Sequence, residues 1–153
     1  MKIRQILSKD SVEPSLTATT KEEAIMELAG LLTRSHPELS RDELVRVLFE
    51  REKLGSTGIG NGVAIPHGKM PGLSQIMAGF GRSHKGVPFE AQDGKAPHLF
   101  FILIAPENAA SLHLKALARL SRLLKDSHFR NKLMEAGSQE ELFQAIVTED
   151  EKF

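Results

Sequence analysis

Hydrophobic residues recur every three or four positions in five segments of the chain, which predicts five amphipathic helices. Three of these segments begin with a hydroxyl residue three positions before a glutamate, a pair that satisfies free N–H groups at a helix start. The pairs are Thr20 and Glu23, Ser40 and Glu43, and Ser138 and Glu141. The other two helices are expected from about Ser111 to Leu124 and from about Asp126 to Ala136, the latter ended by Gly137 in a left-handed conformation.

Three strands are predicted between the second and third helices. Val63 to Pro66 is a short extended segment between glycines, Gln75 to Ser83 alternates, and His98 to Ala105 is continuously apolar. A continuous apolar run is typical of a central strand covered on both faces. The order of elements therefore favours an α/β (or α+β) fold, a single domain with helices packed around a central mixed sheet.

Composition excludes several classes of function. The 153 residues carry 20 basic and 20 acidic side chains, a balance that argues against nucleic-acid binding and against a polybasic membrane anchor. The absence of cysteine excludes disulfides, thiolate nucleophiles and Cys-based metal sites. The longest apolar run, Leu99 to Ala105, is too short to span a membrane, and the N-terminus lacks signal-peptide character. A cytoplasmic protein is expected.

The segment from Arg51 to Lys69, REKLGSTGIGNGVAIPHGK, contains five of the twelve glycines. Its spacing matches neither a P-loop nor the GxGxxG dinucleotide pattern. His67 stands between Pro66 and Gly68, so we expect its imidazole to be held at a strand end and to remain accessible. A neutral ring nitrogen is a competent nucleophile toward phosphorus, and nearby N–H groups can bind phosphoryl oxygens. By spacing alone, an incidental histidine at a strand end is an equally good interpretation.

Two other polar residues lie on otherwise apolar helix stripes. Arg51 continues such a stripe into the last turn of the second helix, and His113 continues one back into the first turn of the helix from Ser111. One interpretation is that Arg51, His67 and His113 converge on an anion, which a helix N-terminus favours. The other is that Arg51 caps its own helix and His113 is a core residue. The closest pair of histidines is 14 residues apart in the sequence, so no metal site is expected.

The segment GSTGIGNGVAIPHG, with Glu52 seven residues before Ile59, resembles the active-site pattern of a bacterial family. This family comprises the enzyme IIA domains of the mannitol/fructose type in the phosphoenolpyruvate-dependent phosphotransferase system. The resemblance covers residues 3–148, including SLHLKALARLSRLLKD and SQEELFQAI, and is strongest to the nitrogen-regulatory IIA type. It implies one domain over residues 3–148, with a largely five-stranded mixed sheet flanked by helices.

The resemblance also implies an activity and its residues. The protein would be a phosphotransferase component that moves a phosphoryl group between proteins through a phosphohistidine. His67 would accept the group on Nε2 from a histidine phosphocarrier protein, His113 would orient and stabilise it, and Arg51 would support the charge of the pocket. No cofactor or metal is implied.

The same resemblance implies regulatory partner proteins, such as potassium-transport regulators and sensor kinases, rather than nucleic acid or membrane. Two alternatives stay open. One is a sugar-specific IIA component, for fructose or mannitol, that donates its phosphoryl group to a IIB domain. The other is a non-catalytic binding module in which the glycine-rich turn is an interaction surface.

Overall fold

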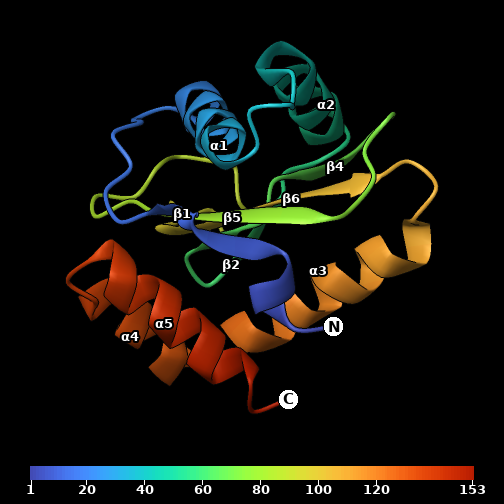
Figure 1. The fold of residues 1–153 in the computed structure, drawn as a ribbon. Helices are drawn as coiled ribbons and strands as arrows, with labels where there is room; N and C mark the ends of the chain where they lie inside the picture. Colours follow the sequence, from blue (N-terminus) through green and yellow to red (C-terminus); the bar gives the residue numbers. More distant parts are fainter.

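A central mixed sheet lies between two layers of helices in the computed structural model, which describes residues 1–153 (Figure 1). Five strands follow the order β1-β5-β6-β3-β2, and a sixth, β4, pairs with β6. The strands are β1 (Leu7–Glu13), β2 (Gly58–Gly60), β3 (Val63–Ala64), β4 (His67–Met70), β5 (Met77–Arg82) and β6 (Leu99–Pro106). The expected mixed sheet flanked by helices is confirmed, with six strands instead of five.

The five predicted helices are present, two on one face of the sheet and three on the other (Figure 1). One face carries α1 (Lys21–Ser35) and α2 (Arg41–Lys53). The other carries α3 (Ala110–Leu124), α4 (Ser127–Glu135) and α5 (Gln139–Asp150). A single 3₁₀ turn, η1 (Ile3–Gln5), precedes β1. None of these helices has the length and apolar character that crossing a membrane requires.

Strand β6 is buried along its whole length and contributes to two hydrophobic cores. Phe101 and Leu103 pack in the core beneath α3, α4 and α5, whereas Phe100 and Ile102 pack in the core beneath α1 and α2. Successive side chains of a strand point to opposite faces, so a strand covered on both sides must be apolar throughout. The prediction made for His98 to Ala105 is therefore confirmed.

The strand predicted from Val63 to Pro66 is shorter in the structure, and a strand that was not predicted follows it. β3 ends at Ala64, and a second strand, β4, begins at His67; both are parallel to β6. Pro66 lies at the break because it has no N–H to contribute to the ladder, while its carbonyl accepts a hydrogen bond from Leu103 N at 3.0 Å. His67 is thus the first residue of a strand, not the last, and its backbone is registered against Leu103.

Strand β1 lies where the hydrophobic pattern predicts no regular element. It pairs in parallel with β5, and its register shifts between Leu7 and Val12. The irregular stretch between them, Ser8 to Ser11, begins with exposed polar side chains. A shifted register breaks the alternation by which a half-buried strand is recognised, and β1 is therefore missed.

The left-handed cap predicted at Gly137 is wrong. Helix α4 ends at Glu135, Ala136 is extended (φ −58°, ψ 137°), and Gly137 does not adopt a positive φ. Its N–H donates instead to the Glu141 carboxylate at 2.7 Å, beside the Ser138 cap of α5. Gly137 therefore belongs to the start of α5 and does not cap the end of α4.

The hydroxyl caps of α1, α2 and α5 are confirmed. Thr20, Ser40 and Ser138 each accept a hydrogen bond from the backbone N–H three residues on, at 3.1 to 3.2 Å. The reciprocal glutamate contacts in α1 and α5 go to the residue before the cap, as from Thr19 N to Glu23 at 2.9 Å. The start of each of these helices is thus fixed by local side chains.

Candidate active site

Three elements meet at one cavity: the end of α2, the start of β4 and the first turn of α3. The cavity has a volume of about 460 Å³, and its lining includes Arg51, His67 and His113. The sequence allows two interpretations, and the structure agrees with the first, in which these three side chains lie together. Arg51 also partly fits the other, since its Nη1 donates to the carbonyl of Gly55 at 2.9 Å.

The backbone fixes the orientation and the tautomer of His67. Its Nδ1 lies 2.6 Å from the carbonyl oxygen of Ile65. A carbonyl oxygen only accepts hydrogen bonds, so Nδ1 carries the proton and donates it. In the neutral ring, Nε2 then holds the lone pair. His67 therefore presents a nucleophilic nitrogen whose position is set by the turn at Ile65 and Pro66.

Burial and charge keep His67 neutral at neutral pH. Burial lowers its pKa below the ordinary value of 6.5, and the positive charge of Arg51 lowers it further. The hydrogen bond to Ile65 and the charge of Glu52 act in the opposite direction but do not cancel the decrease. The unprotonated form that can attack an electrophile is thus the main form near pH 7.

His113 packs edge-on against His67, with ring centroids 5.4 Å apart and an interplanar angle of 80°. It is only 5% exposed, and its Nε2 is buried without a hydrogen-bond partner. Burial, followed by the charges of His67 and Lys69, lowers the pKa of His113 to about 4. A neutral imidazole with an unpartnered buried nitrogen costs free energy, which a ligand in the cavity would offset.

The cavity is also suited to an anion. Helix α3 begins at Ala110 with no side-chain cap at Ala109 and no acidic residue in its first turn. Its N–H groups and positive dipole end therefore favour a negative charge nearby. Arg51 and Lys69 add two cationic side chains to the lining, and its one acidic side chain, Glu50, is paired with Arg46 at 2.7 Å. No group of three or more His, Asp or Glu side chains is arranged to hold a metal ion.

Residue 52, not residue 51, lies on the buried stripe of α2. Arg51 is half-buried, whereas Glu52 is 9% exposed, in line with the buried residues Leu44 and Leu48. The expectation that Arg51 occupies the buried stripe is therefore corrected. A spacing of four from Leu44 through Leu48 leads to Glu52, so the sequence contains the signal. Lys69 was also missed, and only its closeness to His67 in the sequence marks it.

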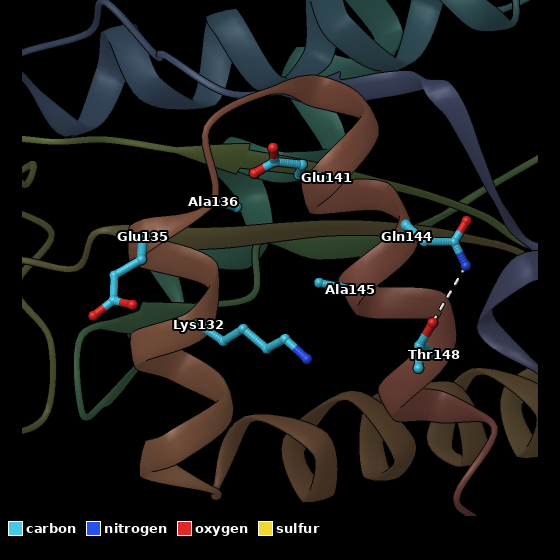
Figure 2. Close-up of a pocket in the computed structure, with 7 residues that line it drawn as sticks. All are labelled: Lys132, Glu135, Ala136, Glu141, Gln144, Ala145 and Thr148. Atoms are coloured by element: carbon cyan, nitrogen blue, oxygen red, sulfur yellow. Dashed lines mark hydrogen bonds between the residues drawn. The ribbon is translucent and has the colours of Figure 1, made fainter.

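A second cavity, of about 420 Å³, lies between α4 and α5 (Figure 2). Lys132 and Glu135 line it from α4, and Gln144 and Thr148 line it from α5. The amide of Gln144 donates to the Thr148 hydroxyl at 3.2 Å, which satisfies both groups across one helical turn. The lining contains no histidine, and the one buried side-chain nitrogen without a hydrogen-bond partner, His113 Nε2, lies in the first cavity.

Comparison with known proteins identifies the family of this site. Residues 5–149 match the family described as "Phosphoenolpyruvate-dependent sugar phosphotransferase system, EIIA 2". The chain is 38% identical over 147 residues to a nitrogen regulatory protein of Bradyrhizobium diazoefficiens, covering 96% of this chain and 95% of that protein. It is 37% identical over 150 residues to a fructose-specific EIIABC component of Bacillus subtilis, covering 98% of this chain and 24% of that protein.

Solved structures show the same architecture. The nitrogen regulatory protein IIA-Ntr of Neisseria meningitidis superposes with a TM-score of 0.88 at 39% identity, over 94% of this chain and 98% of that chain. The mannitol IIA structure of Escherichia coli superposes with a TM-score of 0.75 at 23% identity, over 91% and 97% of the two chains. The latter likeness concerns the fold alone.

Proposed function

Because the chain belongs to the EIIA 2 family of the phosphoenolpyruvate-dependent sugar phosphotransferase system, we propose that it is a phosphocarrier whose acceptor is Nε2 of His67. The donor would be a phosphohistidine on a histidine phosphocarrier protein. The reaction belongs to one domain over residues 3–148 and takes place in the cytoplasm. It needs no cofactor and no metal, because positioning and charge stabilisation are the main requirements of phosphoryl transfer.

In the proposed step, the Nε2 lone pair of His67 attacks phosphorus as the donor's nitrogen–phosphorus bond breaks. The donor ring, protonated on its other nitrogen, leaves as a neutral imidazole with the electron pair of that bond, and phosphorylated His67 keeps its Nδ1 proton, so atoms, charge and electrons balance without a further reactant. No general base is required, since Nε2 of His67 carries no proton in the neutral ring. Arg51 and the N–H groups at the start of α3 would stabilise the phosphoryl oxygens.

The observation that carries the proposal is the pair of ring nitrogens in one cavity. The hydrogen bond between His67 Nδ1 and Ile65 O frees Nε2 for attack, while the buried Nε2 of His113 has no partner. A phosphoryl oxygen would supply that partner by accepting an N–H from neutral His113. This role needs no protonated His113, in keeping with its pKa of about 4.

The regulatory assignment is part of the proposal. It is supported by the similarity to nitrogen regulatory proteins over nearly the whole length of both chains. The comparable identity to a fructose-specific EIIABC component supports the second candidate, a sugar-specific IIA that donates to a IIB domain. Regulatory targets, such as potassium-transport regulators and sensor kinases, would distinguish the phosphorylated protein from the free protein by the added charge.

Incubation with phosphoenolpyruvate, enzyme I and a histidine phosphocarrier protein tests the acceptor. We expect mass spectrometry under alkaline conditions to find one phosphohistidine, at His67, and none in His67→Ala. His128→Ala is the matched control, because His128 is exposed on α4 and should leave labelling unchanged. Unreduced labelling of His67→Ala would exclude the proposed acceptor, and the absence of any label would favour the binding module.

A second assay separates the regulator from the sugar-specific component. The phosphorylated protein is mixed with a fructose or mannitol IIB domain, and transfer is followed over time. A regulator should retain its phosphoryl group under conditions in which a sugar-specific IIA protein donates it. Rapid transfer to a IIB domain would support the sugar-specific candidate.

A further inference from the structure

The proposed chemistry leaves one buried acid of the site without a role. The side chain of Glu52, in the last turn of α2, is 5% exposed and lies next to Arg51 in the sequence. Its carboxylate accepts hydrogen bonds from both the backbone N–H and the hydroxyl of Thr57. Lys21, the first residue of α1, places Nζ 2.8 Å from the same carboxylate. Glu52 therefore joins two helices to the glycine-rich segment.

A continuous chain of contacts leads from Glu52 to the reacting ring. Glu52 holds Thr57 through its N–H, at 3.1 Å, and through its hydroxyl. The carbonyl of Thr57 accepts the N–H of Ile65 at 2.9 Å. The carbonyl of Ile65 in turn accepts Nδ1–H of His67 at 2.6 Å. Each link fixes the residue that makes the next one, and the last link determines which nitrogen of His67 is nucleophilic.

The anchor at the start of this chain is well fixed. Lys21 is 15% exposed, and its ammonium also lies 4.9 Å from the centroid of the Phe89 ring. Thr57 is 3% exposed, so its N–H and hydroxyl have no access to water that could replace Glu52. A buried donor without an acceptor is costly, and the local backbone would have to move to satisfy it. Loss of the acceptor at residue 52 would therefore move the backbone of Thr57 and, with it, the carbonyl of Ile65.

We propose that Glu52 is a positioning residue for His67: as the acceptor for Thr57, it holds the Ile65 carbonyl where it selects the Nδ1–H tautomer. This inference rests on the proposed function, since the tautomer matters because Nε2 is the phosphoryl acceptor. Glu52 is not a catalytic residue, because it acts through Thr57 and Ile65. This role requires a hydrogen-bond acceptor at residue 52 and does not require a negative charge there.

Two substitutions at residue 52 separate the acceptor from the charge. Glu52→Met removes both, whereas Glu52→Gln keeps an amide oxygen that can accept from Thr57. We expect Glu52→Met to slow single-turnover phosphorylation of His67 at least roughly tenfold, as small misplacements of reacting groups do. Nitrogen NMR of the unphosphorylated His67 ring should show a larger share of the Nε2–H tautomer. Glu52→Gln should stay within about threefold of the unchanged protein in rate, since the bond to Thr57 remains.

Two further variants keep the inference testable if Glu52→Met does not fold. Lys21→Met with Glu52→Met removes the ammonium together with its buried partner, so no unpaired buried charge remains; Glu90, the other carboxylate beside Lys21, is exposed to water. Thr57→Val keeps the shape of the side chain and removes one of the two donors to Glu52. We expect the double variant to reproduce the tautomer change of Glu52→Met, and Thr57→Val to show a smaller change in the same direction.

Asp150→Leu is the matched control for the loss of a buried carboxylate. Asp150 is 1% exposed and binds Arg119 and the N–H of Ile3, in a network separate from Glu52. The Asp150→Leu substitution should lower the free energy of unfolding without changing the His67 tautomer. An unchanged tautomer and rate in folded Glu52→Met or in the double variant would overturn the inference. Failure of the unchanged protein to take up phosphate would instead refute the proposed function, and the NMR measurement would still test the positioning.

Discussion

The two histidines of the cavity differ in what their buried nitrogens contact. Nδ1 of His67 has a backbone acceptor at 2.6 Å, whereas Nε2 of His113 has none. The first arrangement fixes a nucleophile before any partner arrives, and the second keeps one donor free for a ligand. Both rings are kept neutral mainly by burial, so neither needs to lose a proton at neutral pH.

Phosphorylation of His67 should decrease as the pH is lowered through the pKa of this residue. That pKa lies below 6.5, and protonation places a proton on Nε2, where the phosphoryl group would bind. The rate from a pre-phosphorylated donor should therefore be level above pH 6.5 and fall below it. An NMR titration of His67 in the free protein provides the comparison, and its midpoint should match that of the rate. A rate that rises as the pH falls would contradict the neutral nucleophile.

Replacement of His113 by leucine should stabilise the fold and slow the reaction. An apolar side chain of similar size removes a buried nitrogen without a partner, which we expect to raise the free energy of unfolding by about 1 kcal/mol. The same change removes the donor proposed for the phosphoryl oxygens, and transfer should slow. Urea unfolding and single-turnover labelling measure the two effects. His113→Ala, which leaves a cavity, should instead be less stable while still folding.

At the scale of elements, the close packing of α2 on β4 places Arg51 near His67. A Cβ added at Gly68 would lie 2.5 Å from Cγ1 of Val47, far inside normal contact. Valine is restricted in rotamer on a helix, so α2 would have to move. Gly68→Ala should therefore cost about 1 to 3 kcal/mol of stability and slow labelling of His67.

Val47→Ala provides the test of that explanation. It removes the clashing methyl group, so adding it to Gly68→Ala should restore most of the labelling rate. The four proteins form a double-mutant cycle, in which unfolding in urea gives the coupling between the two positions. Additive effects would show that Gly68 is needed for a reason other than its contact with α2.

Elements with a local signal were predictable from the sequence, and those that depend on distant partners were not. The N-caps at Thr20, Ser40 and Ser138 depend only on neighbouring residues. The continuously apolar sequence of β6 indicates that the strand is buried on both faces. β1 is stabilised by pairing with β5 across a shifted register, which no local pattern records. Gly137 is a different case: the acceptor of its N–H, Glu141, is only four residues on, but the glycine was assigned to the end of α4 instead of to the start of α5.

The candidate site divides in the same way. The residue types and the Pro66–His67–Gly68 sequence allowed a phosphoryl site and an incidental histidine equally, and the meeting of Arg51, His67 and His113 in one cavity depends on the sheet. The tautomer of His67 could not be predicted, since it is set by a carbonyl oxygen at 2.6 Å. Nor could the partners of Glu52, because Lys21 is 31 residues away and reaches it only when α1 and α2 pack side by side.

At the scale of the whole molecule, phosphorylation would change a protein of zero formal charge into an anion. A phosphoryl group adds about −1.5 to −2 charges at neutral pH. The 20 basic and 20 acidic side chains otherwise balance, so this is a large fractional change. The modification would lie beside Arg51 and Lys69, on a surface that also exposes Leu54 and Leu114. A partner that reads this surface would meet a different charge in each state without any change of fold.

The stability of the whole fold should fall as the pH is lowered from 6.5 toward 4. In the unfolded chain His113 takes up a proton near pH 6.5, whereas in the folded protein its pKa is about 4. Between these values the unfolded state binds more protons, so the free energy of unfolding increases with pH, by on the order of 1 to 3 kcal/mol for this residue. Urea unfolding at several pH values measures the slope, and His113→Leu should flatten it while carboxylates contribute equally in both proteins. Parallel curves for the two proteins would show that His113 does not titrate with a lowered pKa.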